Sequence, residues 1–126
     1  MFMLKNILLV AFGGAAGSVA RYILSKAALS AAPSAFPLGT LAVNALGCLI
    51  MGVVCGLSKG DGAPLSPDAK LLLAAGFCGG FTTFSAFMDE SLTLIKGGDF
   101  PLCVLYVFAS MALGASGLLA GWYLAK

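Results

Sequence analysis

The sequence predicts an all-α membrane protein with four transmembrane helices in one domain, residues 1–126. Hydrophobic residues make up 60% of the chain and charged residues only 10%, and the mean hydropathy is +1.04. Soluble domains contain about 45–50% apolar and about 25% charged residues. The apolar residues form four runs, each long enough to cross the hydrocarbon core as a helix of about 20 residues. Membrane lipid is therefore the expected environment.

The first predicted span covers residues 5–24 and carries a face of small residues at 13–18. Arg21 lies within one turn of the predicted membrane interface. At that position an arginine either extends its side chain to the membrane surface or forms a polar anchor at an aqueous vestibule. The residues alone leave both alternatives open.

The second predicted span covers residues 38–57 and follows a short link in which Pro33 and Pro37 act as helix breakers. Asn44 lies well inside this span, where an unpaired amide is costly. We expect Asn44 either to hydrogen-bond a neighbouring helix or to face water.

The third span lies within residues 71–95 and begins after the helix-start signal Ser66-Pro67-Asp68. Gly79-Gly80 and Thr82-Thr83 weaken its middle as a helix. Interrupted backbone survives in lipid only where protein or a water-filled cavity covers it. The sequence thus predicts a break near mid-membrane beside an ion or substrate site. The alternative is a point where small residues let helices pack closely.

The fourth span covers residues 101–124, and Tyr106 and Ser110 share one of its faces. All four spans contain a G-x-x-x-G pattern, which favours close approach of helix backbones. These glycine pairs are Gly13/Gly17, Gly52/Gly56, Gly76/Gly80 and Gly117/Gly121.

Positive charges are almost balanced between the two sides of the predicted bundle. Lys5, Lys59, Lys70 and Lys126 fall on one side, and Arg21, Lys26 and Lys96 fall on the other. Because positive residues set membrane orientation, a ratio of four to three predicts insertion in both orientations. Four short spans are too few to enclose a pore, so we expect an antiparallel, dual-topology homodimer.

Two phenylalanines and several polar residues suggest a path for a small anion. Phe84 and Phe87 are three residues apart and share a helix face. An aromatic ring has a positive edge, which can face an anion. The candidate hydrogen-bond donors at comparable depth are Asn44, Ser85, Tyr106 and Ser110. The alternative is that the two rings only pack in the core.

The chain carries no pattern typical of an enzyme or of a zinc site. It contains no His, no G-x-S-x-G, no P-loop and no H-E-x-x-H. Asp89 and Glu90 are adjacent, so on a helix they point in different directions and make a poor acid–base pair. The four cysteines form no C-x-x-C pair. A net charge of +2 without a basic stripe argues against a nucleic-acid partner.

Taken together, these residues resemble the Fluc/CrcB family of fluoride channels over essentially the whole chain. The similarity includes Gly17 with Arg21 in the first span, the stretch 39–47 around Asn44, and Tyr106 with Ser110. Its most specific part is Gly79-Gly80-Phe81-Thr82-Thr83-Phe84-Ser85-x-Phe87-x-x-Glu90. One departure is Ala86, where the family commonly has Thr.

The resemblance implies an antiparallel homodimer with two fluoride pores, each lined by both subunits. Phe84 and Phe87 match the family's phenylalanine box, Asn44 its pore asparagine, and Tyr106 and Ser110 the polar side of the path. Arg21 and Glu90 are the expected vestibule residues, with Glu90 an acid near the pore. The backbone carbonyls of Gly79 and Thr82 match a structural Na⁺ site at the dimer centre.

The expected function is therefore a passive channel that exports F⁻ across the bacterial cytoplasmic (inner) membrane. A rival class is the small multidrug-resistance exporter, which is also a four-span antiparallel dimer. That class requires an acidic residue in the first span, whereas the first acid here is Asp61. A third possibility is an accessory membrane protein whose polar residues only join helices.

Overall fold

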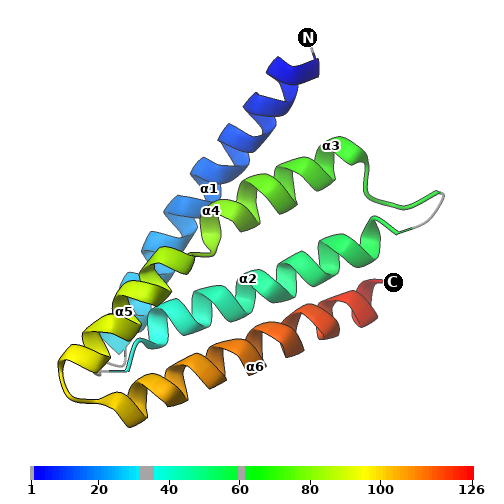
Figure 1. The fold of residues 1–126 in the computed structure, drawn as a ribbon. Helices are drawn as coiled ribbons and strands as arrows, with labels where there is room; N and C mark the ends of the chain where they lie inside the picture. Colours follow the sequence, from blue (N-terminus) through cyan, green and yellow to red (C-terminus); the bar gives the residue numbers. More distant parts are fainter. Residues whose placement is uncertain (1, 32–35, 60–61) are drawn as a thin grey trace.

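Helices account for most of the chain that the structure describes (Figure 1). The structure is a computed structural model, and it describes residues 2–31, 36–59 and 62–126. Its elements are α1 (Phe2–Ala31), α2 (Leu38–Leu57), α3 (Pro67–Lys70), the π-helix η1 (Leu71–Cys78), α4 (Gly79–Phe81), α5 (Phe84–Lys96) and α6 (Phe100–Ala125). Within these residues four helical stretches are long and apolar enough to cross a membrane, which confirms the all-α class and the four spans. Pro33 and Asp61 lie outside the described residues.

The second span has the predicted limits, whereas the first is longer than predicted. α2 begins at residue 38 and ends at residue 57. α1 continues to Ala31, because residues 25–31 contain three alanines and no proline, and alanine is the strongest helix former. Arg21 therefore lies ten residues before the end of α1, about 15 Å along its axis. The predicted end of the first helix near residue 24 is therefore seven residues too early.

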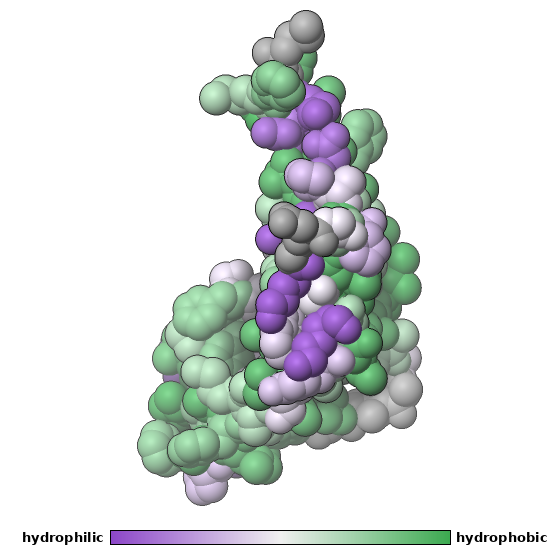
Figure 2. Space-filling view, turned by 90° about the vertical axis from the view of Figure 1, so that its right-hand side faces the viewer, coloured by the Kyte–Doolittle hydropathy of each residue, from purple (hydrophilic) through white to green (hydrophobic). Residues whose placement is uncertain are grey.

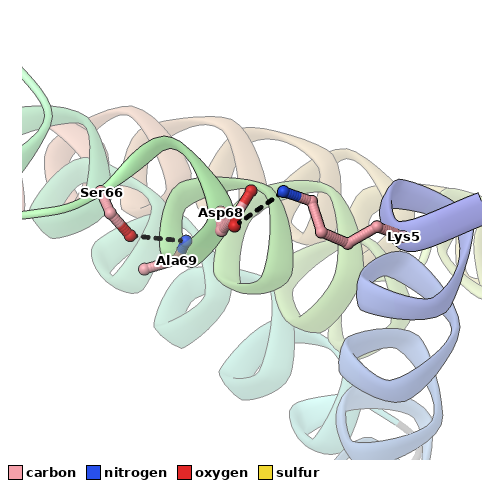
Figure 3. Close-up of polar contacts among 4 residues, drawn as sticks. All are labelled: Lys5, Ser66, Asp68 and Ala69. Atoms are coloured by element: carbon pink, nitrogen blue, oxygen red, sulfur yellow. Dashed lines mark hydrogen bonds and ion pairs between the residues drawn. The ribbon is translucent and has the colours of Figure 1, made fainter. Parts of the chain in front are cut away.

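Ser66 caps the third stretch as predicted (Figure 3). Its hydroxyl accepts a hydrogen bond from the Ala69 N–H at 3.1 Å, and Pro67 follows at the first helical position. The Lys5 ammonium forms an ion pair with Asp68 at 3.2 Å, which joins the start of α1 to α3. η1 then continues with the wider turns of a π-helix, a form that is rare in proteins and often found near functional sites.

The helical ladder of the third stretch is interrupted at Thr82 and Thr83. α4 ends at Phe81, and Thr82 is extended, with φ −86° and ψ 158°. Thr83 is also extended, with φ −149° and ψ 118°, and its hydroxyl accepts from the Ala86 N–H at 3.2 Å to cap α5. Gly79 keeps helical angles, with φ −62° and ψ −38°. The extended residues are thus the threonine pair.

Two pairs of helices cross closely at glycines. α1 lies across η1 and α4, and α2 runs alongside α6 (Figure 1). A Cβ atom on Gly76 would lie 3.0 Å from the Gly13 Cα, and one on Gly56 would lie 2.9 Å from the Trp122 carbonyl oxygen. The predicted close approach is confirmed for both sets, which are Gly13, Gly17, Gly76 and Gly80 at one crossing and Gly52, Gly56, Gly117 and Gly121 at the other.

The outer surface is largely apolar. Large hydrophobic side chains are exposed along all four spans, and Phe2 and Leu124 are 80% and 82% exposed. Figure 2 shows hydrophilic residues gathered in a narrow column at one end of the molecule, with hydrophobic residues on both sides of it. That end carries the N-terminus, the loop between α2 and α3, and the C-terminus. An apolar surface of this extent is typical of a protein covered by lipid or by another chain.

Candidate functional site

Asn44 of α2 pairs with the backbone at the interruption. Its Oδ1 accepts a hydrogen bond from the Thr83 N–H at 2.9 Å, and its Nδ2 donates to the Thr83 carbonyl oxygen at 3.1 Å. Buried backbone groups require partners, and here a side-chain amide replaces the partners that a helix would supply. Of the two alternatives for Asn44, the hydrogen bond to a neighbouring span is the one observed.

The interruption also changes the surroundings of the Gly79 and Thr82 carbonyl groups. In a continuous α-helix these oxygens would accept from the N–H groups of residues 83 and 86. The Thr83 N–H instead donates to Asn44, and the Ala86 N–H donates to the Thr83 hydroxyl. The carbonyl oxygens of Gly79 and Thr82, which are the expected cation ligands, therefore do not receive the hydrogen bonds that a continuous α-helix would give them.

Arg21 approaches the same segment from α1. Its Nε donates a hydrogen bond to the Gly80 carbonyl oxygen at 3.2 Å. This contact is possible because Gly17, one turn earlier, lets α1 approach the backbone of Phe77 and Phe81 closely. Arg21 is therefore tied to the third span beside the interruption.

A groove of about 480 Å³ opens beside the interruption. Four of the six residues expected on the anion path line it, namely Asn44, Phe84, Phe87 and Ser110. The other lining residues are Cys48, Thr82, Thr83, Met111, Gly114, Ala115 and Leu118. The fold thus brings α2, the interruption with the start of α5, and the middle of α6 to one site.

Phe84 and Phe87 have different surroundings in this groove. Their ring centroids are 6.0 Å apart, with 47° between the planes. Phe87 is only 8% exposed and packs against Tyr106, with ring centroids 5.1 Å apart. Phe84 is 73% exposed. One ring is therefore fixed by the core, and the other stands at the open side of the groove.

The expected hydroxyl donors lie in three different settings. The Ser110 Oγ is buried and has no hydrogen-bond partner among the described residues. The Ser85 Oγ lies 3.4 Å from the Thr83 Oγ1 at an exposed position. Tyr106 does not line the groove, and its hydroxyl donates to Glu90. Ser110 is therefore the groove hydroxyl whose hydrogen-bonding capacity is unused.

Glu90 is held by hydroxyl groups from two other spans. Thr40 of α2 donates to its Oε2 at 3.0 Å, and Tyr106 of α6 donates to its Oε1 at 3.0 Å. Glu90 and Thr40 line a second groove of about 330 Å³, which shares no lining residue with the first. Arg21 and Glu90, expected together at a vestibule, thus have different partners.

The sequence analysis does not predict the hydrogen bonds that the Thr40 and Thr83 hydroxyls form. For Thr83 a signal exists, because a threonine directly before an apolar helical run is a typical N-cap. For Thr40 no local sequence signal exists, since its hydrogen-bond partner Glu90 is 50 residues away in the chain.

The four membrane-spanning helices, and a polar site built on an interrupted helix, define a multi-pass membrane protein of the channel and transporter class. Residues 8–122 match the family described as CrcB-like protein, Camphor Resistance (CrcB). The chain belongs to this family.

Curated relatives cover nearly the full length of the chain. A protein of Chlorobaculum tepidum is 46% identical over 98% of this chain and 97% of its own length. A protein of Phocaeicola vulgatus is 41% identical over 98% of this chain and all of its own length, and one of Rhizobium johnstonii is 47% identical over 90% of each. All three bear the name fluoride-specific ion channel FluC.

Proposed function

We propose that this protein is a fluoride-selective, passive ion channel. The observation that carries the proposal is the convergence of Asn44, Phe84, Phe87 and Ser110 on one groove. Relatives in the same family, named fluoride-specific ion channels, support it. The multidrug-exporter alternative receives no support from the family, and α1 contains no acidic residue.

Fluoride is small and strongly hydrated, so a selective pore must replace many of its water contacts. Ser110 offers a buried hydroxyl without a partner among the described residues, and Asn44 uses only one of its two amide hydrogens on Thr83. The positive ring edges of Phe84 and Phe87 supply further favourable contacts. Tyr106 contributes by fixing Phe87, and Ser85 lies at the exposed start of α5. Chloride is easier to dehydrate, so a narrow passage must exclude it.

The working unit in this proposal is an antiparallel homodimer. The groove is open on one side, where Phe84 is 73% exposed. A second copy that inserts in the opposite orientation would cover this side and line the path from the other chain. Two copies related by an axis in the membrane plane also place both interruptions near mid-membrane, where lipid-exposed irregular backbone is not tolerated.

A structural Na⁺ ion at the dimer centre is part of the same proposal. The Gly79 and Thr82 carbonyls suit it, because their helical donors are diverted to Asn44 and to Thr83. Hard cations bind oxygen ligands, and helix ends in membrane proteins supply them as backbone carbonyls. When bound, the ion would supply a positive charge that holds carbonyl groups of two chains together.

The proposed location is the bacterial cytoplasmic membrane. Neutral HF crosses lipid, dissociates in a less acidic cytoplasm and leaves F⁻ trapped inside. A passive pore lets F⁻ leave down its electrochemical gradient and so relieves its toxicity.

Electrical recording of the purified protein in lipid bilayers tests the function directly. We expect current in fluoride, little in chloride, and no dependence on a proton gradient. Passive fluoride efflux from liposomes should agree with the current. Proton-coupled export of organic cations, or no flux of either halide, would contradict the proposal.

A further inference from the structure

The last turns of α2 and α6 lie against each other at the hydrophilic end of the molecule (Figures 1 and 2). Gly56 permits this contact, because a Cβ there would lie 2.9 Å from both the Ala125 Cβ and the Trp122 carbonyl oxygen. The chain that leaves α2 is thereby brought next to the end of α6.

Two lysines meet on one aromatic residue at this point. The Lys59 Nζ lies 4.5 Å from the ring centroid of Trp122, and the Lys126 Nζ lies 4.9 Å from it. Lys126 also lies 4.6 Å from the ring centroid of Tyr123, whose ring meets the indole edge-on at 5.1 Å. Cation–π contacts of this length restrain an ammonium group without neutralising its charge.

Neither ammonium group has a carboxylate partner among the described residues. Lys5, at the same end of the molecule, forms an ion pair with Asp68. Within the described residues no other ion pair is found. Lys59 and Lys126 are both exposed. Two positive charges are therefore held close together and free to bind an anion.

We propose that Lys59, Lys126 and Trp122 bind the phosphodiester headgroup of an anionic phospholipid. Trp122 and Lys126 lie at the end of α6, an apolar helix of 26 residues, and Lys59 reaches the same point from the end of α2. Trp and Tyr at a helix end mark the membrane–water interface. Basic groups at this level attract anionic lipids. The two ammonium groups supply the donors for the phosphate, and the rings pack beside the glycerol region. This inference does not depend on the proposed function.

Trp122 is the single tryptophan of the chain, so its fluorescence reports on this site alone. The protein is reconstituted in phosphatidylcholine liposomes that contain either spin-labelled phosphatidylglycerol or spin-labelled phosphatidylcholine, with the label at the same acyl position. We expect phosphatidylglycerol to quench Trp122 at a mole fraction lower by on the order of tenfold, from two lysines near the surface.

The double variant Lys59→Gln/Lys126→Gln should lose this preference, and the matched variant Lys26→Gln/Lys96→Gln should keep it. Equal quenching by the two lipids in the unchanged protein would overturn the proposal, since the lysines would then interact only with the helix ends. A preference that survives in the double variant would also overturn it. Inorganic phosphate, compared with chloride at equal ionic strength, should leave the preference intact, and its loss in phosphate would assign the site to free phosphate.

Discussion

At the residue scale, Asn44 illustrates how one side chain supports an interruption in a membrane helix. Both polar atoms of its amide pair with the backbone of Thr83, at 2.9 and 3.1 Å. No single-acceptor or single-donor side chain can do the same. In lipid, unpaired backbone groups cost several kcal/mol each, so this pairing is a condition for the site to exist.

We expect Asn44→Asp to destabilise the protein and to reduce fluoride flux strongly. The aspartate loses the donor to the Thr83 carbonyl and places a negative charge beside that oxygen and beside the groove. The loss of one buried hydrogen bond costs about 1–3 kcal/mol. Thermal unfolding and liposome efflux measure the two effects. Asn6→Asp, at an exposed position of α1, is the matched control, and equal effects of the two changes would rule out this role for Asn44.

The groove phenylalanines give a second prediction at this scale. Phe84→Ile and Phe87→Ile keep apolar bulk but remove the ring quadrupole, so each should slow fluoride flux strongly while the dimer still forms. Phe→Met at either position should be milder, because a polarizable side chain partly substitutes. Because Phe87 is buried and Phe84 is exposed, Phe87→Ile should also lower thermal stability more than Phe84→Ile.

Phe77→Ile is the control for the ring-edge prediction. Phe77 stacks on Phe81, with ring centroids 5.4 Å apart, and does not line the groove. Its replacement should affect packing but not flux. Equal fluoride efflux from all three isoleucine variants, with intact dimers by size-exclusion chromatography, would show that the groove rings only pack.

At the element scale, the crossing of α1 with η1 and α4 determines where Arg21 and Gly80 meet. A Cβ on Gly17 would overlap the Phe77 carbonyl oxygen and lie 2.8 Å from the Phe81 nitrogen. A Cβ on Gly14, on the same helix, would meet only the Gly76 carbonyl oxygen, at 3.8 Å. The two glycines therefore differ in packing and not in helical context.

We expect Gly17→Ala to destabilise the protein by about 1–3 kcal/mol, as overpacking of a close helix crossing does. Gly14→Ala should be neutral or stabilising by up to about 1 kcal/mol, because alanine favours the helix. Thermal or denaturant unfolding in detergent compares the two. A similar loss of stability in Gly17→Ala and Gly14→Ala would mean that the backbones of α1 and η1 do not approach each other as closely as the structure describes.

At the scale of the whole molecule, the distribution of positive charge bears on membrane orientation. Lys5, Lys59, Lys70 and Lys126 stand against Arg21, Lys26 and Lys96. A ratio of four to three gives little orientation bias. The prediction of dual topology that follows from it can be tested directly.

A reporter fused after Lys126 should be found on both sides of the membrane. Two lysines added to the loop between α2 and α3 should bias insertion and reduce functional dimers, because the proposed antiparallel dimer needs both orientations. Co-expression with an oppositely biased version should restore fluoride efflux. A reporter on one side only, in the otherwise unchanged protein, would contradict dual topology.

The number of spans, their apolar character, the limits of α2 and the Ser66 cap could all be predicted from the sequence. These features depend on local composition and on neighbours a few residues away, which a single chain displays directly. The residue types of the groove were also readable, because their spacing within each span resembles a known family. The end of the first helix was predicted too early. Residues 25–31 were assigned to the link between spans, although their alanines favour a helix and prolong α1 to Ala31.

The pairing of polar groups between spans, in contrast, depends on how the helices pack. Asn44 pairs with Thr83 across 39 residues, Thr40 with Glu90 across 50, and Arg21 with Gly80 across 59. The Arg21–Gly80 contact follows from the glycine crossing of α1 with η1 and α4. The two contacts of α2 with the third stretch occur where Gly47 lets α2 approach Thr82 closely. A pattern within one helix carries no information on the depth or rotation of that helix against another. For this reason the sequence indicates which side chains are available to the site, and the packing of helices selects the partner of each.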